Sequence, residues 1–235
     1  MKRFIAAGVA IVALLGTVGS PRANTIIISQ DRSTSVYGEV FNANSGQTWT
    51  MQDAESAPDQ GLFDSSLSVG PQGDGALAMA QAFQTSSLAA DSLSAIGSTF
   101  LLLATQPDSS AVAVSGSATS TFDVVFELTG AAAFALAGHV SAGLASTTDL
   151  TLTGPGGLVY EAHPDQETVF FDEAGVLGPG QYQLQLHVVS EGTTQGVTLI
   201  FGAGYDLLLT LEPTVSLEPA SWSSVKGAYH DGTGR

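Results

Sequence analysis

A strict alternation of apolar and polar residues is the feature that most constrains how this chain can fold. Every second residue from Phe122 to Leu128 is apolar, and Asp123 and Glu127 occupy the opposite positions. Between Tyr182 and Val188 the same pattern recurs, with glutamines and a histidine in the intervening positions. A period of two residues is typical of a strand that has one buried face and one exposed face. The sequence therefore predicts half-buried β-strands in both segments.

Similar runs recur at short intervals along the chain, separated by turn residues. Further strands are predicted over 26–29, 36–41, 48–51, 134–140, 197–201 and 205–211. The run Ala76–Phe83 has good helix formers but also alternates, so we interpret it as a strand. The acid-, Pro- and Gly-rich stretch 53–75 is interpreted as a loop. Regular short strands without a long amphipathic helix indicate an all-β antiparallel sandwich, either a jelly roll or Ig-like.

The glycine-rich motif at 154–157, Gly-Pro-Gly-Gly, admits two interpretations. A phosphate-binding loop would need a helix after the glycines and a nearby lysine. Here a strand-like run, Leu158–Tyr160, follows, and the chain has no Lys between residues 3 and 225. Pro and Gly are also the residues that tight turns require. The motif therefore predicts a turn between two paired strands, and Gly178–Gly180 is interpreted as a second turn of this kind.

The two ends of the chain differ in amino-acid composition from its middle. Residues 1–23 combine Lys2 and Arg3 with a short apolar run, the layout of a cleavable secretory signal peptide. Residues 24–211 are predicted to form the sandwich, as one domain or as two sub-domains divided near 105–120. Residues 212–235 are predicted to be a linker and a flexible tail, in which Trp222 could belong to a sorting or docking segment. We therefore expect a bacterial protein that is secreted or displayed at the cell surface.

The charge of the chain is strongly one-sided. It contains 6 Lys and Arg against 22 Asp and Glu, a formal net charge of −16. Removal of the signal peptide would leave 3 basic residues and a net charge of −19. Nucleic acid and anionic membrane surfaces both need a basic footprint, so neither is an expected partner. No membrane insertion is expected after signal removal, and the absence of Cys leaves no disulfide.

Several motifs in the second half of the chain resemble a known family. They are the strand Phe-Asp-Val-Val-Phe-Glu-Leu (122–128), the hairpin Leu-Thr-Gly-Pro-Gly-Gly (152–157) and Leu-Gly-Pro-Gly-Gln-Tyr-Gln-Leu (177–184). This part resembles the globular region of exosortase-sorted, PEP-CTERM-type bacterial exported proteins. It also looks like the pre-peptidase C-terminal domain of secreted hydrolases. The resemblance implies a non-catalytic extracellular role, but the membrane-anchoring sorting helix of the first family does not follow Leu217-Glu-Pro219.

Residues for catalysis do not form a recognisable motif. The nucleophile motif G-x-S-x-G is absent, and the four histidines are not spaced as metal ligands. No catalytic residue is therefore predicted, and no cofactor. His163, in a loop with acidic neighbours, could bind a metal or be an ordinary solvated histidine.

Acidic residues cluster in two segments that could supply oxygen ligands to calcium. The first segment contains Asp53, Glu55, Asp59 and Asp64, and the second contains Asp165, Glu167, Asp172 and Glu173. The loop signature of an EF-hand is missing from both. A structural calcium ion in the first segment is thus one hypothesis, and a solvated acidic surface is the other.

Two aromatic residues are candidates for sugar binding, because sugar-binding modules stack exposed rings on sugar faces. Trp49 lies among polar residues, and Tyr37 lies in a predicted strand. The alternative for Trp49 is an ordinary core residue, which is the usual role of a large aromatic side chain. Three functions follow as hypotheses: a non-catalytic surface or matrix protein, a carbohydrate-binding module, or an accessory domain of a secreted hydrolase. The expected partners are extracellular polysaccharide or other surface proteins.

Overall fold

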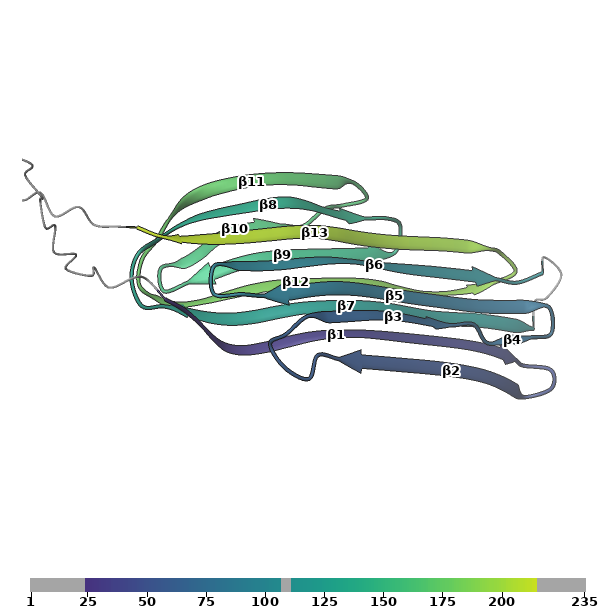
Figure 1. Cartoon of the computed structure of the whole chain (residues 1–235). Helices are drawn as coiled ribbons and strands as arrows, with labels where there is room; N and C mark the ends of the chain where they lie inside the picture. Colours follow the sequence, from purple (N-terminus) through teal and green to yellow (C-terminus); the bar gives the residue numbers. More distant parts are fainter. Residues whose placement is uncertain (1–23, 107–110, 215–235) are drawn as a thin grey trace, which may run out of the picture. The chain divides into compact units, whose positions relative to one another are not determined.

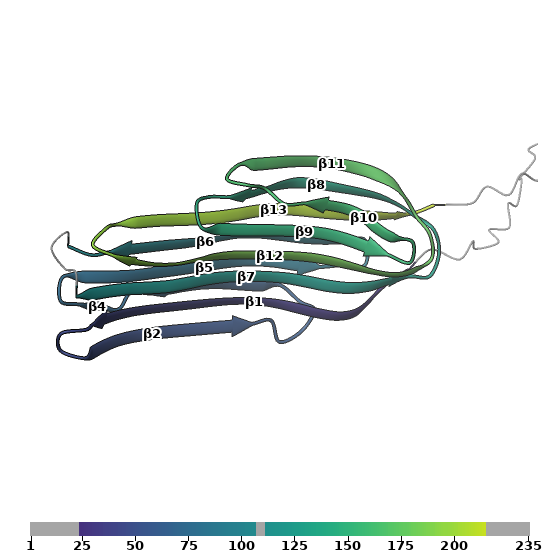
Figure 2. The same cartoon turned by 180° about the vertical axis from the view of Figure 1, so that it is seen from behind.

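The computed structural model describes residues 24–106 and 111–214, which form two packed antiparallel sheets without a helix. The predicted signal peptide and the tail around Trp222 lie outside the described residues. Sheet A has the order β10 (Gly157–Ala162), β9 (Ser146–Gly154), β12 (Gly180–Gln195), β7 (Val112–Leu128), β1 (Thr25–Asn42) and β2 (Gln47–Ser56). Sheet B has the order β11 (Thr168–Leu177), β8 (Ala132–Ala142), β13 (Leu199–Pro213), β6 (Ser92–Ala104), β5 (Ala76–Leu88) and β3 (Phe63–Val69), with the short β4 (Gln72–Gly73) beside β5. Figure 1 shows these strands, and Figure 2 shows them from behind. The predicted all-β antiparallel sandwich is confirmed.

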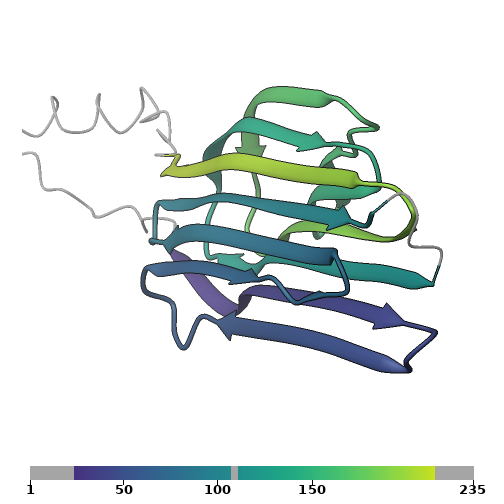
Figure 3. The ribbon, with the colours of Figure 1, turned by 90° about the vertical axis from the view of Figure 1, so that its right-hand side faces the viewer.

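The strand order identifies the sandwich as a jelly roll with an N-terminal extension. Four antiparallel pairs are nested in the sequence: β6 with β13, β7 with β12, β8 with β11, and β9 with β10. The first and third pairs lie side by side in sheet B, and the second and fourth lie in sheet A, which is the jelly-roll arrangement. Strands β1 and β2 extend sheet A, and β5 and β3 extend sheet B. Figure 3 shows the long strands running in similar directions in the two layers.

The alternation predicted for 122–128 and 182–188 is confirmed at the centre of sheet A, in β7 and β12. The alternate apolar residues, from Phe122 to Leu128 and from Tyr182 to Val188, are all buried, whereas Val125 on the outward side is only half-buried. The run 76–83 is a strand, as interpreted. The motif at 154–157 is the turn of the β9–β10 hairpin, in which Gly154 pairs with Gly157 across Pro155 and Gly156.

Three local predictions are wrong. The stretch 53–75 is not one loop, because β2 continues to Ser56 and β3 and β4 follow. Strand β3 was not predicted from the sequence because serine occupies most of its positions between Phe63 and Val69. Gly178–Gly180 does not close a hairpin, since β11 and β12 belong to different sheets. Val197 lies before β13, which begins at Leu199, and it is exposed rather than part of the buried face.

Strand β7 joins the two parts of the chain that flank residues 105–120. It begins at Val112, pairs with β1 along one edge and pairs with β12 along the other. The N-terminal and C-terminal strands therefore share sheet A.

The interior contains two apolar clusters that differ in the size of their side chains. The first lies between the jelly-roll strands and contains large side chains such as Phe122, Phe126 and Leu209. The second lies between the N-terminal strands and contains the alanines of β5. A row of inward-facing glycines, Gly38–Gly116–Gly192, crosses β1, β7 and β12 at this end. A Cβ atom at Gly38 would lie 2.9 Å from the Ala78 carbonyl oxygen. These small residues let the two sheets approach closely.

A band of hydrogen-bonded polar side chains separates the two clusters. On β7, Ser120 lies between Ala118 of the second cluster and Phe122 of the first. The Ser120 hydroxyl is 2.9 Å from the Tyr205 hydroxyl and donates to the Gln84 amide oxygen at 3.4 Å. Gln84 in turn donates to Ser86, and Arg32 donates to Ser86. We call this connected set, Arg32–Ser86–Gln84–Ser120–Tyr205, the polar seam.

Every buried polar side-chain atom of the described residues has a hydrogen-bond partner. A fully bonded interior network avoids the desolvation penalty of unpaired groups and specifies a single strand register. The seam therefore explains how a core with so many serines and threonines can be stable.

Candidate functional site

The outer face of sheet A is polar. On sheet A the outward residues of the central strands β7, β12 and β9 are mostly Ser, Thr, Gln and acidic residues. Asp123, for example, accepts hydrogen bonds from Gln183 and Gln185 across the β7–β12 pair. A polar outer face is the usual arrangement of an antiparallel sandwich. The face of sheet A is therefore both solvated and rich in hydrogen-bonding groups.

Two aromatic residues of β1, Tyr37 and Phe41, face outward on this side of the sheet, and Tyr37 is the one that lines hollows in the polar face. Tyr37 pairs with Gln52 on β2 and with Ser117 on β7, and Ser117 pairs with Glu191 on β12. These four residues form a row across four strands, which we call the Tyr37 row. At the usual strand spacing the row spans about 14 Å. Tyr37 is only half-buried, because Val36 and Val40 take the inward positions of β1.

Shallow hollows lie on both sides of the Tyr37 ring. The hollow toward β2 has a volume of about 480 Å³ and is lined by Ser35, Gln52 and Asp53 among others. The hollow toward β12 has a volume of about 410 Å³ and is lined by Ser115, Glu191 and Thr193 among others. Tyr37 and Ser117 line both. The ring is thus flanked by hydroxyl, amide and carboxylate groups.

The Tyr37 hydroxyl is held in place by its neighbour on the same face. It donates a hydrogen bond of 2.7 Å to Glu39 Oε2. This hydrogen bond, together with partial burial and the negative charge of Glu39, raises the pKa of Tyr37 above its ordinary value. The phenol therefore stays protonated, and the hydrogen bond restrains the orientation of the ring.

The structure does not bring Trp49 and Tyr37 together. Trp49 pairs with the inward-facing Val40 and packs against the second apolar cluster. Its ring covers Gly73, where an added Cβ would lie 2.4 Å from ring carbons. Trp49 is therefore a core residue at the sheet edge, whereas Tyr37 faces solvent on the outer face of sheet A.

The four calcium candidates of the first acidic segment are spread over several elements. Asp53 and Glu55 are on β2, Asp59 is in the connection to β3, and Asp64 is on β3. Their visible contacts are with the protein: Asp59 Oδ1 accepts from Gly61 N at 2.8 Å, and Asp64 Oδ1 accepts from Thr85 at 2.8 Å. Across the described residues no three His, Asp or Glu side chains are grouped to hold a metal ion.

The second acidic segment is likewise divided. Asp165 and Glu167 precede β11, whereas Asp172 and Glu173 are consecutive residues of β11 and so point to opposite sides of the strand. The structure therefore does not gather these four carboxylates into one site.

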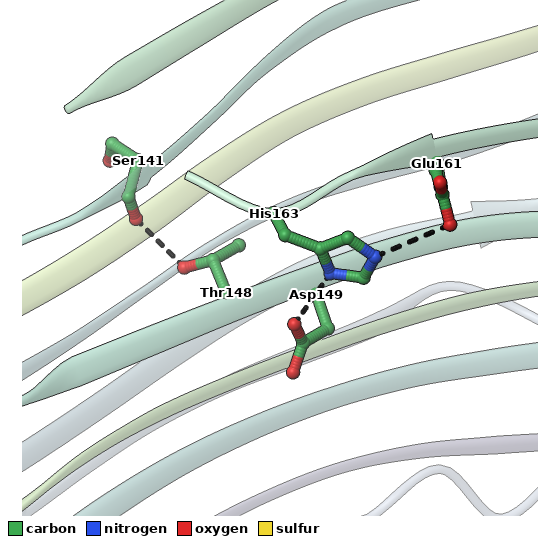
Figure 4. Close-up of polar contacts among 5 residues, drawn as sticks. All are labelled: Ser141, Thr148, Asp149, Glu161 and His163. Atoms are coloured by element: carbon green, nitrogen blue, oxygen red, sulfur yellow. Dashed lines mark hydrogen bonds and ion pairs between the residues drawn. The ribbon is translucent and has the colours of Figure 1, made fainter. Parts of the chain in front are cut away.

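His163 forms a contact that the sequence did not predict. Its Nδ1 lies 2.7 Å from Asp149 Oδ1, and its Nε2 lies 3.6 Å from Glu161 Oε2. Figure 4 shows the ring between the two carboxylates, with Thr148 nearby donating to the Ser141 carbonyl oxygen. In a nucleophilic triad one ring nitrogen must face the nucleophile. Here both nitrogens face carboxylates at an exposed position, so His163 cross-links β9 to the end of β10.

A larger hollow, of about 640 Å³, lies near the β9–β10 and β11–β12 turns. Its lining includes Pro155, Pro179, Gln181 and Gln183, without a charged side chain. The one aromatic residue in that lining, Tyr182, is 5% exposed and donates to the Gly178 carbonyl oxygen. This hollow lacks the exposed ring and the carboxylates that surround Tyr37.

Sequence reasoning found Tyr37 but not its surroundings. Gln52, Ser117 and Glu191 come from three strands that are distant in the sequence, and only the strand order places them in one row. The alternation of 181–188 does indicate that polar residues of β12 face outward. It contains no information on which strand lies beside β12.

Comparisons with known proteins leave the family open. The sequence matches no protein-family model, and no curated protein matches it significantly. Among solved structures, a similar chain comes from the "Structure of infectious bursal disease virus Gx strain", with 9% identity and a TM-score of 0.25. The match covers 84% of this chain and 58% of that chain. A likeness at this score supports no inference, and the family resemblance seen in the sequence stays a prediction. Within the described residues there is no helix that could span a membrane.

Proposed function

We propose that this chain is an exported, non-catalytic protein of the cell surface or extracellular matrix that binds neutral polysaccharide around Tyr37. The observation that supports this proposal is the position of the Tyr37 ring, which stands between two polar hollows on a solvated sheet face. A sugar ring has an apolar face of C–H groups and a polar rim of hydroxyls. An aromatic ring beside hydrogen-bonding groups is complementary to both.

The groups around Tyr37 suit hydroxyl-bearing ligands in particular. Carboxylates such as Asp53 and Glu191 accept hydrogen bonds from hydroxyl groups, and these charge-assisted bonds are stronger than neutral ones. The Gln52 amide can both donate and accept. Because neither hollow is lined by a cation, uronic-acid polymers would be repelled by the same carboxylates. Neutral polysaccharide is therefore the ligand class that this face favours.

Binding isotherms on an insoluble neutral glucan, measured with and without calcium, test the proposal. Tyr37→Ala removes the ring, and we expect a two- to tenfold weaker binding, about 0.5–1.5 kcal/mol. Tyr37→Phe keeps the ring and should retain most of the affinity. The matched control is Phe170→Ala, which removes an aromatic side chain that is 77% exposed on sheet B.

Two results would count against a sugar-binding face at Tyr37. One is an isotherm for Tyr37→Ala that equals the parent isotherm while the variant keeps its fold by circular dichroism. The other is stronger retention on a polyuronate than on the neutral glucan in the absence of calcium. If the parent binds no neutral glycan, neutral polysaccharide is rejected as the ligand, and the proposed surface role is left without a known ligand.

A further inference from the structure

The outer face of sheet B carries a cluster of large apolar side chains among its polar residues. Six large side chains lie together on the outward positions of β5, β6 and β13: Leu77, Met79, Phe83, Phe100, Leu102 and Ile200. Ile200 is 61% exposed, and the other five are half-buried. Antiparallel sandwiches normally place polar residues on such a face. Contiguous apolar surface of this kind marks an interaction site.

This apolar cluster lies next to a strip of bare backbone. Gly202 pairs with Phe100, and Gly204 pairs with Ser98, both on the outward side of β13. A Cβ atom at Gly202 would meet only the Thr99 carbonyl oxygen within 4 Å, so no side chain covers this residue. The face therefore has large side chains on β5 and, on β13 beyond Ile200, a flat strip at Gly202 and Gly204, with β6 between the two strands.

We propose that this face joins two copies of the chain about a twofold axis that runs along β6. Such an axis places β5 of one copy over β13 of the other. In the register of the sheet, Phe83 then lies over Gly204 of the second copy, and Met79 lies over its Ile200. Leu102 lies on the axis and meets Leu102 of the second copy. Phe83 is thus received by the bare backbone of β13 in the second copy, whereas Met79 packs on Ile200, and each contact occurs twice, as a twofold interface requires.

The charges of the outer strands fit the same arrangement. Strands β3 and β8 lie at equal distances on the two sides of β6. The axis therefore brings Asp64 of β3 over His139 of β8 in the second copy, and the reverse pair forms by symmetry. In each contact the Asp64 carboxylate faces an imidazole that can donate a hydrogen bond to it, so the symmetric contact is favourable at both ends.

The size and the charge of the face favour a second copy over other occupants. About 25 outward residues on β3, β5, β6, β13 and β8, at about 32 Å² of sheet each, give roughly 800 Å² per copy, the area of a stable interface. Chains of net charge −16 repel one another, so they can meet only where carboxylates are few. Across β5, β6, β13 and β8 the outward acidic residues are Asp206 and Glu212.

Sedimentation analysis of the purified mature chain tests the proposal. We expect a concentration-dependent dimer whose affinity increases with salt, because salt screens the repulsion between the two copies. Leu102→Glu places two like charges against each other on the axis and should weaken the dimer at least tenfold. Ile200→Glu should act in the same direction. Val189→Glu adds the same charge to the outer face of sheet A and should leave the dimer unchanged.

A cysteine variant locates the axis, because the chain contains no cysteine of its own. Leu102→Cys should form a disulfide dimer rapidly under mild oxidation, and Val189→Cys should not. The proposal is overturned if the parent remains a monomer up to millimolar concentration. Equal cross-linking of the two cysteine variants would overturn it as well, as would a dimer that Leu102→Glu and Ile200→Glu leave intact.

Discussion

At the scale of single residues, Arg32 is a buried cation whose side chain donates hydrogen bonds to several separate parts of the chain. It is the only Lys or Arg between residues 23 and 225, and it is 1% exposed. Its guanidinium donates to the carbonyl oxygens of Asp59 at 2.5 Å, Gly61 at 2.8 Å and Ser86 at 3.2 Å. Burial lowers the pKa of Arg32, but the guanidinium of an arginine is so basic that it remains charged. One cation therefore ties β1 to the β2–β3 connection and to β5.

Replacing Arg32 should destabilise the protein strongly. Arg32→Met keeps an apolar stem but leaves three carbonyl oxygens without their donor, so we expect a loss of about 3–5 kcal/mol in the free energy of unfolding. Arg32→Lys keeps the charge, but a single ammonium group cannot replace the planar fork, and about 2 kcal/mol should be lost. Urea unfolding measures both values. Asp31→Asn, at the exposed neighbouring position, is the control and should change stability by less than about 0.5 kcal/mol. A loss below about 1 kcal/mol for Arg32→Met would show that the guanidinium contacts are dispensable.

At the scale of strands, the pairing of β8 with β13 depends on one glycine. Gly138 has a φ of +147°, and a Cβ atom built there would lie 1.9 Å from the Asp206 carbonyl oxygen. The obstacle is the backbone of the neighbouring strand, which cannot rotate away as a flexible side chain can.

Gly138→Ala should therefore cost at least about 3 kcal/mol of stability, because both the strained φ and the backbone clash oppose it. Gly156→Ala, in the β9–β10 turn, is the matched control, since nothing lies within 4 Å of its added Cβ. Thermal unfolding of the two variants gives the comparison. If Gly138→Ala unfolds at the same temperature as Gly156→Ala, β8 and β13 can separate locally without loss of the fold.

The strands that sequence reasoning recovered differ physically from those it missed. From Phe122 to Leu128 the inward positions are all apolar, so the pattern is visible without neighbours. Strand β1 was predicted only in two pieces, because its inward positions at Arg32 and Thr34 belong to the polar interior. Strand β2 is a sheet edge that is exposed on most of its residues, so no burial pattern marks it. An alternation of hydrophobicity reports burial only where the interior itself is apolar.

The same reasoning explains what the sequence could reveal of the candidate site. Tyr37 was recognisable as an aromatic residue in a predicted strand. Its partners Gln52 and Glu191 were not, because their proximity follows from the order β2–β1–β7–β12 and not from spacing along the chain. Trp49 was a candidate for its polar neighbours in the sequence, yet its place opposite Val40 turns it inward.

At the scale of the whole molecule, the polar seam lies between the two apolar clusters, and Tyr205 forms the end of the seam that belongs to the first cluster. Burial raises the pKa of the Tyr205 hydroxyl well above its ordinary value, and the hydrogen bond with Ser120 opposes this shift only in part. The unfolded chain would titrate near the ordinary tyrosine pKa of about 10. Because the folded pKa is the higher one, the folded state favours the neutral phenol. This contribution to stability is complete below about pH 10 and is lost as the pH rises from there toward the folded pKa.

Alkaline pH should consequently unfold both halves of the sandwich together. We expect the free energy of unfolding to be constant between about pH 7 and 9 and to fall steeply above about pH 10. Tyr205→Phe should lose about 1 kcal/mol at neutral pH with its hydrogen bond, but its stability should fall less steeply in alkali. Urea titrations at several pH values, followed by far- and near-ultraviolet circular dichroism, measure the slope and the cooperativity. Parallel slopes for the parent and Tyr205→Phe would place the alkaline transition on other tyrosines. Separate transitions for the two signals would show that the strands and the aromatic packing are not lost together, and so that the sandwich does not unfold as one unit.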